Sequence, residues 1–260
     1  MFILTDIKRY LYLINFKYKH KKTKVFCSYF NNVTKGFYSQ RGQDAIVYSE
    51  FFLLINHKNF PKIIVDIGCN HPIKFNNSYF FEKNLGFLCI AVDPIKNYVK
   101  DWAKMRPKAI LHNVALGFRK GNLSLMTSDN LDGHQSSSYA DDMLSTLLID
   151  KKKFKSGNWK IEKVAVLKTQ TLFNTAKLSE IGIMSIDVEG FEMEVIKGID
   201  FSKTRIHIMI IENNTNGKFG SDEIRKIMNR HGFIFYARIW ALDDIFLNKN
   251  DLEYIYPSQY

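Results

Sequence analysis

Apolar runs separated by helix-length segments constrain the fold of this chain more than any other feature. Seven runs are typical of buried strands, and they are Lys62–Ile67, Phe87–Val92, Ala109–Leu116, Ile183–Asp187, Ile206–Ile211, Phe233–Ala237 and Ile245–Leu247. Helices are expected at Asn77–Leu85, Tyr98–Met105, Glu192–Lys197 and Ser221–His231. Gly86 and Gly232 follow the first and the last of these segments, as is common at helix ends. Strands that alternate with helices predict an α/β fold with a mostly parallel seven-stranded sheet flanked by helices.

The length and composition fit one such domain with an addition at its N-terminus. The 260 residues are 46% hydrophobic, which suffices for a single sizeable core. We expect the domain to cover residues 38–260 and a basic helical extension to cover residues 1–37. Within residues 1–26, seven lysines and arginines stand against one acid, and apolar residues recur at helical spacing.

The basic segment and the cysteines bear on where the protein works. Residues 1–26 can pack on the domain, lie on an anionic membrane surface or contact another polyanion. They are too short and too charged to span a membrane, and they lack the apolar region of a signal peptide. The three cysteines match no metal-binding spacing, which indicates a reduced protein. We therefore expect a cytoplasmic location, with peripheral membrane contact through residues 1–26 left open.

The loop after the first apolar run has the residues of a ligand-binding turn. Asp66 ends the run, and Gly68 lets the backbone approach a ligand closely. A dinucleotide site would need the pattern GxGxxG, but the segment continues as Cys69-Asn70-His71-Pro72 and has no further glycine. No GxxxxGK[ST] pattern occurs either. A cofactor with a diphosphate group, and with it a nicotinamide-linked oxidoreductase, is disfavoured.

The end of the second strand supports a different cofactor. Asp93 follows this strand, and an acid there can accept hydrogen bonds from both hydroxyls of a ribose. S-adenosylmethionine has a ribose and a charged amino-acid tail but no phosphate. The alternative for Asp66 is that it only caps the following turn.

The order of several motifs resembles one family. The segments "SQRGQD", "VDIGCNHPIKFNNSYFFEKNLGF", "VDP", "NVALG", "SIDVEGFEMEVIKGID" and "IIEN" are similar to those of FkbM-type methyltransferases, over about Tyr38 to Asn213. These enzymes depend on S-adenosylmethionine and have the Rossmann-like class I methyltransferase fold. This chain departs from the usual pattern in two places. His71-Pro72 stands where many methyltransferases have another glycine, and Asp93 replaces a glutamate.

The resemblance implies roles for several residues. Asp66 and Gly68 would line the methionine part of the cofactor, and Asp93 would hold the ribose. Asn113, Val114 and Ala115 would lie near the adenine, although the two apolar residues suit a core equally well.

Two further polar residues are candidates for cofactor binding. Asn70 belongs to the loop after the first strand, and Gln43 belongs to the "SQRGQD" segment, which could close over the cofactor or the acceptor. Alternatively, Ser39 and Asp44 of that segment only start a helix.

Acidic residues follow two later strands. Asp187 ends one strand, and Glu212 and Asn213 end the next. Because the ends of adjacent parallel strands meet, these three could bind Mg²⁺ or another divalent cation through oxygen ligands. Asp187 could instead contact the ammonium of the cofactor or act as a base without metal, and Glu212 could pair with a lysine.

A base would help to activate an acceptor hydroxyl. The candidates are Asp187, Glu189 and His134, the last in a polar segment, Thr127–Ser156, that is expected to form a loop or lid.

The residues and the resemblance together favour an S-adenosylmethionine-dependent O-methyltransferase. The expected acceptor is a sugar hydroxyl of a surface glycan or a nucleotide sugar. The first alternative is N-methylation of a peptide side chain. The second is a non-catalytic module that uses the net charge of +11 to bind nucleic acid or membrane. Acidic strand ends would repel phosphate, so no nucleic-acid partner is expected.

Overall fold

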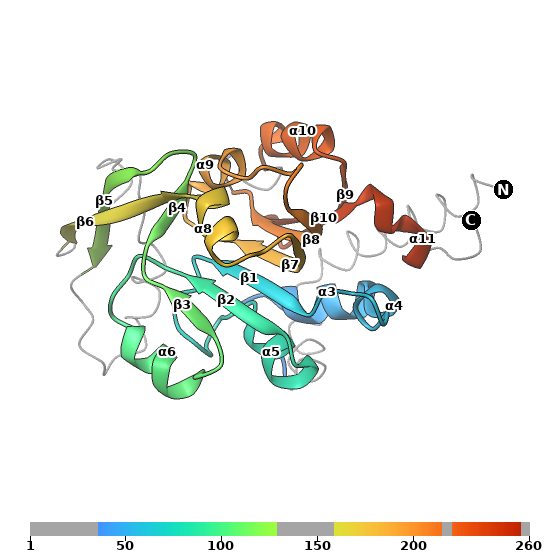
Figure 1. Ribbon diagram of the computed structural model, residues 1–260, viewed down its shortest axis with the longest axis horizontal. Helices are drawn as coiled ribbons and strands as arrows, with labels where there is room; N and C mark the ends of the chain where they lie inside the picture. The colour runs from blue at the N-terminus through green and yellow to red at the C-terminus, as the bar shows by residue number, and fades with distance from the viewer. Residues whose placement is uncertain (1–35, 129–158, 215–219, 256–260) are drawn as a thin grey trace.

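The computed structural model describes residues 36–128, 159–214 and 220–255. Its main sheet has seven strands in the order β3-β2-β1-β7-β8-β10-β9 (Figure 1). Their bounds are β1 Ile63–Ile67, β2 Leu88–Val92, β3 Ile110–His112, β7 Glu180–Ile186, β8 Arg205–Glu212, β9 Phe233–Ile239 and β10 Asp243–Asn248. Neighbours from β3 to β8 are parallel, and β10 is antiparallel to both β8 and β9. The predicted mostly parallel sheet is confirmed.

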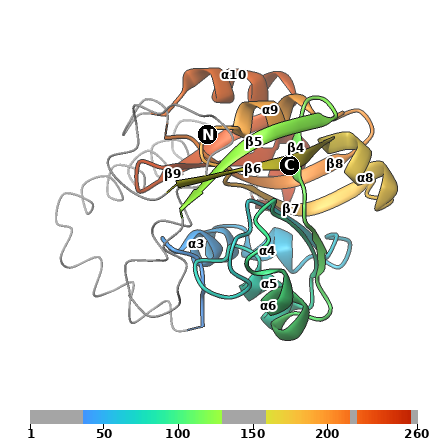
Figure 2. The same cartoon turned by 90° about the vertical axis from the view of Figure 1, so that its left-hand side faces the viewer.

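Helices cover both faces of this sheet. Their bounds are α3 Gln43–Glu50, α4 Phe52–Ile55, α5 Tyr79–Leu85, α6 Val99–Met105, α8 Thr169–Thr175, α9 Glu192–Lys197, α10 Asp222–Arg230 and α11 Leu252–Ile255, with a 3₁₀ turn at Lys249–Asp251. Figure 2 shows α9 and α10 on one side of the sheet and α5 and α6 on the other. The four expected helices are confirmed to within two residues at either end. Nearer the N-terminus, α3 and α4 are separate helices because the chain bends between them at Phe51.

The core divides into two layers because alternate strand residues face opposite sides. In β1, Val65 and Ile67 pack in the layer with α8 to α10, whereas Ile64 packs in the layer with α3 to α6. Burying side chains of this size contributes about 1.5–3 kcal/mol each. Long apolar strands are therefore required here, since a sheet covered on both faces has no solvent side.

The run Ala109–Leu116 is the main departure from the predicted strands. It divides into β3 and a separate strand, β4 (Ala115–Gly117), because the chain turns between them at Asn113, where the N–H of Val114 donates to the carbonyl of His112. With β5 (Gly121–Ser128) and β6 (Trp159–Lys168), β4 forms a second sheet in the order β4-β6-β5. Neither β5 nor β6 was predicted.

Two sequence-based expectations lie outside the described residues. One is the helical extension at residues 1–37, of which only the last two residues are described, and the other is most of the polar segment from 127 to 156. Among the helices that the structure does describe, each falls short of the length and apolar character needed to cross a bilayer.

Candidate active site

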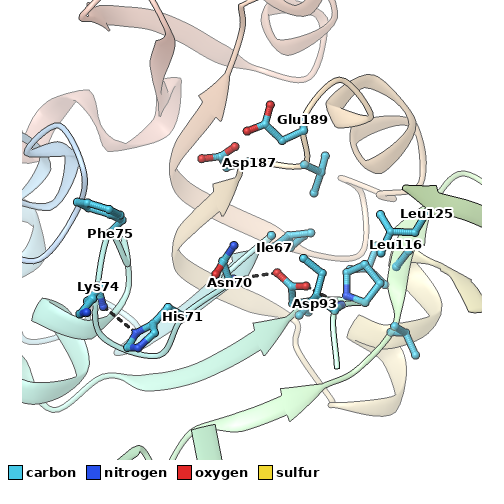
Figure 3. Close-up of a pocket in the computed structure, with 17 residues that line it drawn as sticks. Ile67, Asn70, His71, Lys74, Phe75, Asp93, Leu116, Leu125, Asp187 and Glu189 are labelled. Carbon is cyan, nitrogen blue, oxygen red and sulfur yellow. Dashed lines mark hydrogen bonds between the residues drawn. The ribbon is translucent and has the colours of Figure 1, made fainter. Parts of the chain in front are cut away.

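A pocket opens where the carboxyl ends of β1, β2 and β7 meet (Figure 3). Its lining comes from residues 67–75, 92–95, 114–116 and 187–189, together with Leu125 of β5. Open sheets of this kind bind ligands at this edge. The pocket unites the two loops and the strand ends on which the sequence-based site was built.

Gly68 meets protein backbone as well as the pocket. Its φ is 81°, and a Cβ at this position would lie 1.6 Å from the carbonyl oxygen of Asp187. Its N–H donates to the carbonyl of Val92 at 2.8 Å. A glycine is required here because the loop after β1 lies directly against the loop after β7.

Asp93 connects the loops after β1 and β2. The side chain is buried and lines the pocket, and Oδ2 accepts a 2.8 Å hydrogen bond from the N–H of Asn70 (Figure 3). Oδ1 accepts from the N–H of Ile95, also at 2.8 Å. Each oxygen has a second lone pair, so the carboxylate can still accept a hydroxyl of a ligand. This position fits the predicted ribose role of Asp93. Asn70 lies beside it and also lines the pocket.

Asp66 lies behind the pocket wall. In β1 it faces away from Ile67, and its carboxyl group is buried beside Ser78 and Ser185, with the charge of Arg106 nearby. Burial raises its pKa, although both serines and the arginine oppose this. Asp66 is therefore not among the residues that line the pocket, because the alternation of the strand turns it toward the core, and its predicted contact with a cofactor stays a prediction.

A buried arginine, which the sequence did not reveal, supports the loop after β1. The guanidinium of Arg106 donates to the carbonyl of Pro72 at 3.1 Å and to Asn76 Oδ1 at 2.9 Å, and it pairs with Glu82 at 2.6 Å. It also lies 4.4 Å from the ring centre of Trp102. Such a network fixes the loop in one conformation.

The far end of the pocket has an apolar wall. Val114, Ala115, Leu116 and Leu125 line it, and Figure 3 shows the two leucines beyond Asp93. Asn113 is not on this wall, because its amide donates to the carbonyls of Asp93 and Ile95. Val114 and Ala115 thus line the pocket, and their predicted place near an adenine stays a prediction, whereas Asn113 holds the loop after β2.

Gln43 lies away from the pocket. Its Nε2 donates to Asp243 at 3.0 Å, and its Oε1 accepts from the N–H of Arg41 at 2.9 Å. Gln43 is not among the residues that line the pocket, and its predicted contact with a cofactor stays a prediction.

Three carboxyl groups gather beside the pocket. One oxygen each of Asp187, Glu189 and Glu212 lies within 4.8 Å of the others. Asp187 follows β7, and Glu212 ends β8. Glu189 is brought back toward them by a left-handed turn, with φ of 53°, that Glu192 stabilises by accepting from the N–H groups of Val188 and Gly190.

Burial and mutual repulsion raise the pKa values of this group. Loss of solvent is the largest cause throughout, followed by neighbouring carboxylates. The pKa is raised to about 7 for Glu189 and to about 9 for Glu212, and that of Asp187 lies well above its ordinary value. Asp243 of β10 adds to the repulsion, and its own pKa is raised to about 6, mainly by burial.

One oxygen of this group has no hydrogen-bond partner. Glu212 is 8% exposed, and its Oε2 is buried without a partner within the part of the chain that the structure describes. A buried carboxyl oxygen without a partner is costly unless a ligand or ion satisfies it.

The predicted metal set changes at one position. Asn213 does not join the carboxyl groups, because its Oδ1 accepts from the N–H of Ser221 and its Nδ2 donates to Asp244. Its amide group thus connects the N-terminus of α10 with Asp244 of β10. Glu189 stands in the group instead, with Asp187 and Glu212 as predicted. The base candidate His134 lies outside the described residues.

Comparison with known proteins identifies the family. No curated protein and no solved structure gives a significant match. The family model of the methyltransferase FkbM domain matches residues 66–235, which is more than half of the chain. The match begins in β1 and ends in β9, so it includes both loops of the pocket and all three carboxyl groups. The chain therefore belongs to the FkbM methyltransferase family.

Proposed function

We propose that this protein transfers a methyl group from S-adenosylmethionine to a sugar hydroxyl of a surface glycan or nucleotide sugar. The observation that carries the proposal is a single pocket in which a ribose-type acid, Asp93, and two raised-pKa acids, Asp187 and Glu189, share one lining. When bound, S-adenosylmethionine supplies a methyl group on a sulfonium centre, and the neutral thioether is the leaving group.

The cofactor fits the pocket in one direction. Asp93 would accept from the ribose, and Val114, Ala115 and Leu125 would contact the adenine. The loop at Gly68 and Asn70 would then face the methionine part.

The acidic end of the pocket would receive the acceptor. A sugar hydroxyl is a weak nucleophile near neutral pH, so a group that accepts its proton helps the reaction. In the cation-free site Glu189, with a pKa raised to about 7, is matched to that task. A cation bound to the same carboxyl group would take over this task, because it lowers the pKa of the hydroxyl itself. Asp187 would orient the hydroxyl toward the methyl group, since an in-line displacement depends on alignment.

We also infer that Asp187, Glu189 and Glu212 hold a divalent cation such as Mg²⁺. Three carboxyl oxygens within 4.8 Å are suitable hard ligands, and the buried Oε2 of Glu212 lacks a partner among the described residues. A bound cation would supply a positive charge that stabilises the ionised acceptor oxygen. It would also offset the repulsion that raises the pKa values of these acids.

The cofactor assignment is tested by calorimetric titration with S-adenosylhomocysteine. Asp93→Asn should weaken binding at least tenfold, because an NH₂ group replaces one carboxylate oxygen and cannot accept a hydrogen bond from a ribose hydroxyl. Glu162→Gln, an exposed change on β6, is the matched control. Equal affinities of the wild type and Asp93→Asn would reject the ribose role.

The acceptor class is tested by methyl transfer to panels of methyl pyranosides, nucleotide sugars and peptides. Products on sugar oxygen support the proposal. Products only on peptide nitrogen would identify the N-methyltransferase alternative instead.

The basic segment would keep the enzyme near a membrane-attached acceptor from the cytoplasmic side. The full-length chain should sediment with anionic liposomes, and a variant without residues 1–26 should not. Equal sedimentation of both would reject this part of the proposal.

A further inference from the structure

Phe75 is exposed at the pocket mouth in an unfavourable backbone conformation. It is 49% exposed, lines the pocket and has a φ of 55°. Left-handed backbone is uncommon for a bulky residue and concentrates at functional sites. An exposed ring contributes little to the core, so folding alone does not account for a phenylalanine here.

The neighbouring residues hold the ring in place. Asn76 is buried and donates to the carbonyls of Cys69 and His71, while its Oδ1 accepts from the N–H groups of Ser78 and Tyr79. The other side of the loop is closed by His71, whose Nδ1 accepts from the N–H groups of residues 73 and 74 at 3.0 Å. The ring is therefore presented by a preformed loop.

The position of the ring separates it from the apolar wall. Figure 3 shows Phe75 at the end of the pocket away from Leu116 and Leu125, with Asp187 and Glu189 along the side between them. If the adenine occupies the wall, Phe75 is left to the acceptor. A flat ring beside two hydrogen-bonding acids suits a ligand with one apolar face and polar edges.

We propose that Phe75 is the acceptor platform, on which the C–H face of a pyranose ring rests while its hydroxyl meets Asp187 and Glu189. This inference rests on the proposed function and assigns the acceptor subsite within it. The ring would act as a specificity-determining residue, with the bond-making left to the acids and the cofactor.

The test uses saturation-transfer NMR on full-length protein loaded with S-adenosylhomocysteine. The probes are the methyl glycosides of glucose, galactose, mannose, fucose and rhamnose. The wild type should transfer saturation to C–H protons on one face of at least one probe. Phe75→Ala should weaken the affinity of the protein for that glycoside about tenfold, and Phe75→Trp should restore this affinity. Phe118→Ala, which removes a ring of similar exposure outside the pocket, should change nothing.

The affinity for S-adenosylhomocysteine, measured in the same variants, separates the failures. An unchanged affinity in Phe75→Ala with loss of glycoside binding supports the platform. Weaker binding of S-adenosylhomocysteine in that variant would overturn it, because the ring would then belong to the cofactor site. Absence of a glycoside signal in the wild type would also overturn the platform. The proposed methyltransferase function would be rejected only if S-adenosylhomocysteine failed to bind as well.

Discussion

Glu212 and Asp243 lie directly opposite each other on the antiparallel strands β8 and β10, and both are buried. Like charges in such a pair destabilise a sheet. The amide of Gln43, which donates to Asp243, satisfies one side of the pair, but Oε2 of Glu212 has no partner within the described ranges. The protein thus keeps an unfavourable arrangement at the edge of its pocket, as is typical of functional sites.

Replacing Glu212 by glutamine should stabilise the cation-free protein and weaken cation binding. Near neutral pH, Glu212 has to take up a proton on folding because its folded-state pKa is about 9, whereas glutamine is already neutral. The free energy of unfolding in EDTA should therefore rise by about 1 kcal/mol. Calorimetry with Mn²⁺ should show at least tenfold weaker binding. Glu162→Gln is the control. A variant that binds Mn²⁺ as tightly as the wild type would remove Glu212 from the metal set.

The cation-free protein should lose stability as the pH rises. The folded-state pKa values of Glu189 and Glu212, about 7 and 9, lie above the ordinary value of 4.5, so the native state binds these protons more tightly than the unfolded state. Their contribution is complete below about pH 4.5 and is lost as the pH rises through the folded values. Urea unfolding in EDTA from pH 5 to 9 measures it. The free energy of unfolding should fall less steeply with pH in Glu212→Gln than in the wild type. Identical slopes would show that Glu212 does not contribute to the pH dependence.

Two left-handed glycines allow a matched test of the contact behind the pocket. Gly68→Ala should cost at least about 3 kcal/mol, because its Cβ would overlap the carbonyl oxygen of Asp187. Gly86→Ala has a similar φ but open space around its Cβ, and should cost only about 1 kcal/mol. Urea unfolding compares the two. Equal costs would show that backbone strain, and not the close contact, requires glycine at position 68.

Removing the guanidinium of Arg106 should be strongly destabilising. Arg106→Met leaves Glu82 without its partner and the carbonyl of Pro72 without a donor, so a loss of about 3–5 kcal/mol is expected. Arg119→Met, at an exposed position, should stay within about 0.5 kcal/mol of the wild type. Thermal unfolding of both variants checks this, and a loss below 1 kcal/mol for Arg106→Met would mean that the loop does not depend on the network.

Phe75→Gly should increase stability while it weakens acceptor binding. Glycine adopts a φ of 55° without strain, so a gain of about 1 kcal/mol in the free energy of unfolding is expected. The same protein should show the weakened glycoside binding of Phe75→Ala. A variant that is less stable than the wild type would indicate that the ring supports the fold.

The sequence predicted those parts of the site that depend on strand ends alone. Asp187 and Glu212 end neighbouring parallel strands, so their meeting followed from the fold class. Asp243 could not be placed with them, because its position depends on the antiparallel pairing of a strand that comes after a further helix. Asn213 was assigned to the wrong partners for the same reason, since Asp244 of that strand takes its amide.

Long side chains and turns were the other limit. Arg106 ends a helix in the sequence like many surface arginines, and only the packed structure shows it beneath the loop after β1. The split of Ala109–Leu116 depends on hydrogen bonds from Asn113 to a distant loop. The alternation of buried Val164 and Val166 in β6 was a usable signal for the second sheet.

The contact between Gly68 and the backbone of Asp187 has a consequence for motion. The loop after β1 and the loop after β7 touch through main-chain atoms, so we expect no hinge between these two loops. We therefore expect the loop after β1 and the loop after β7 to move together when a ligand binds.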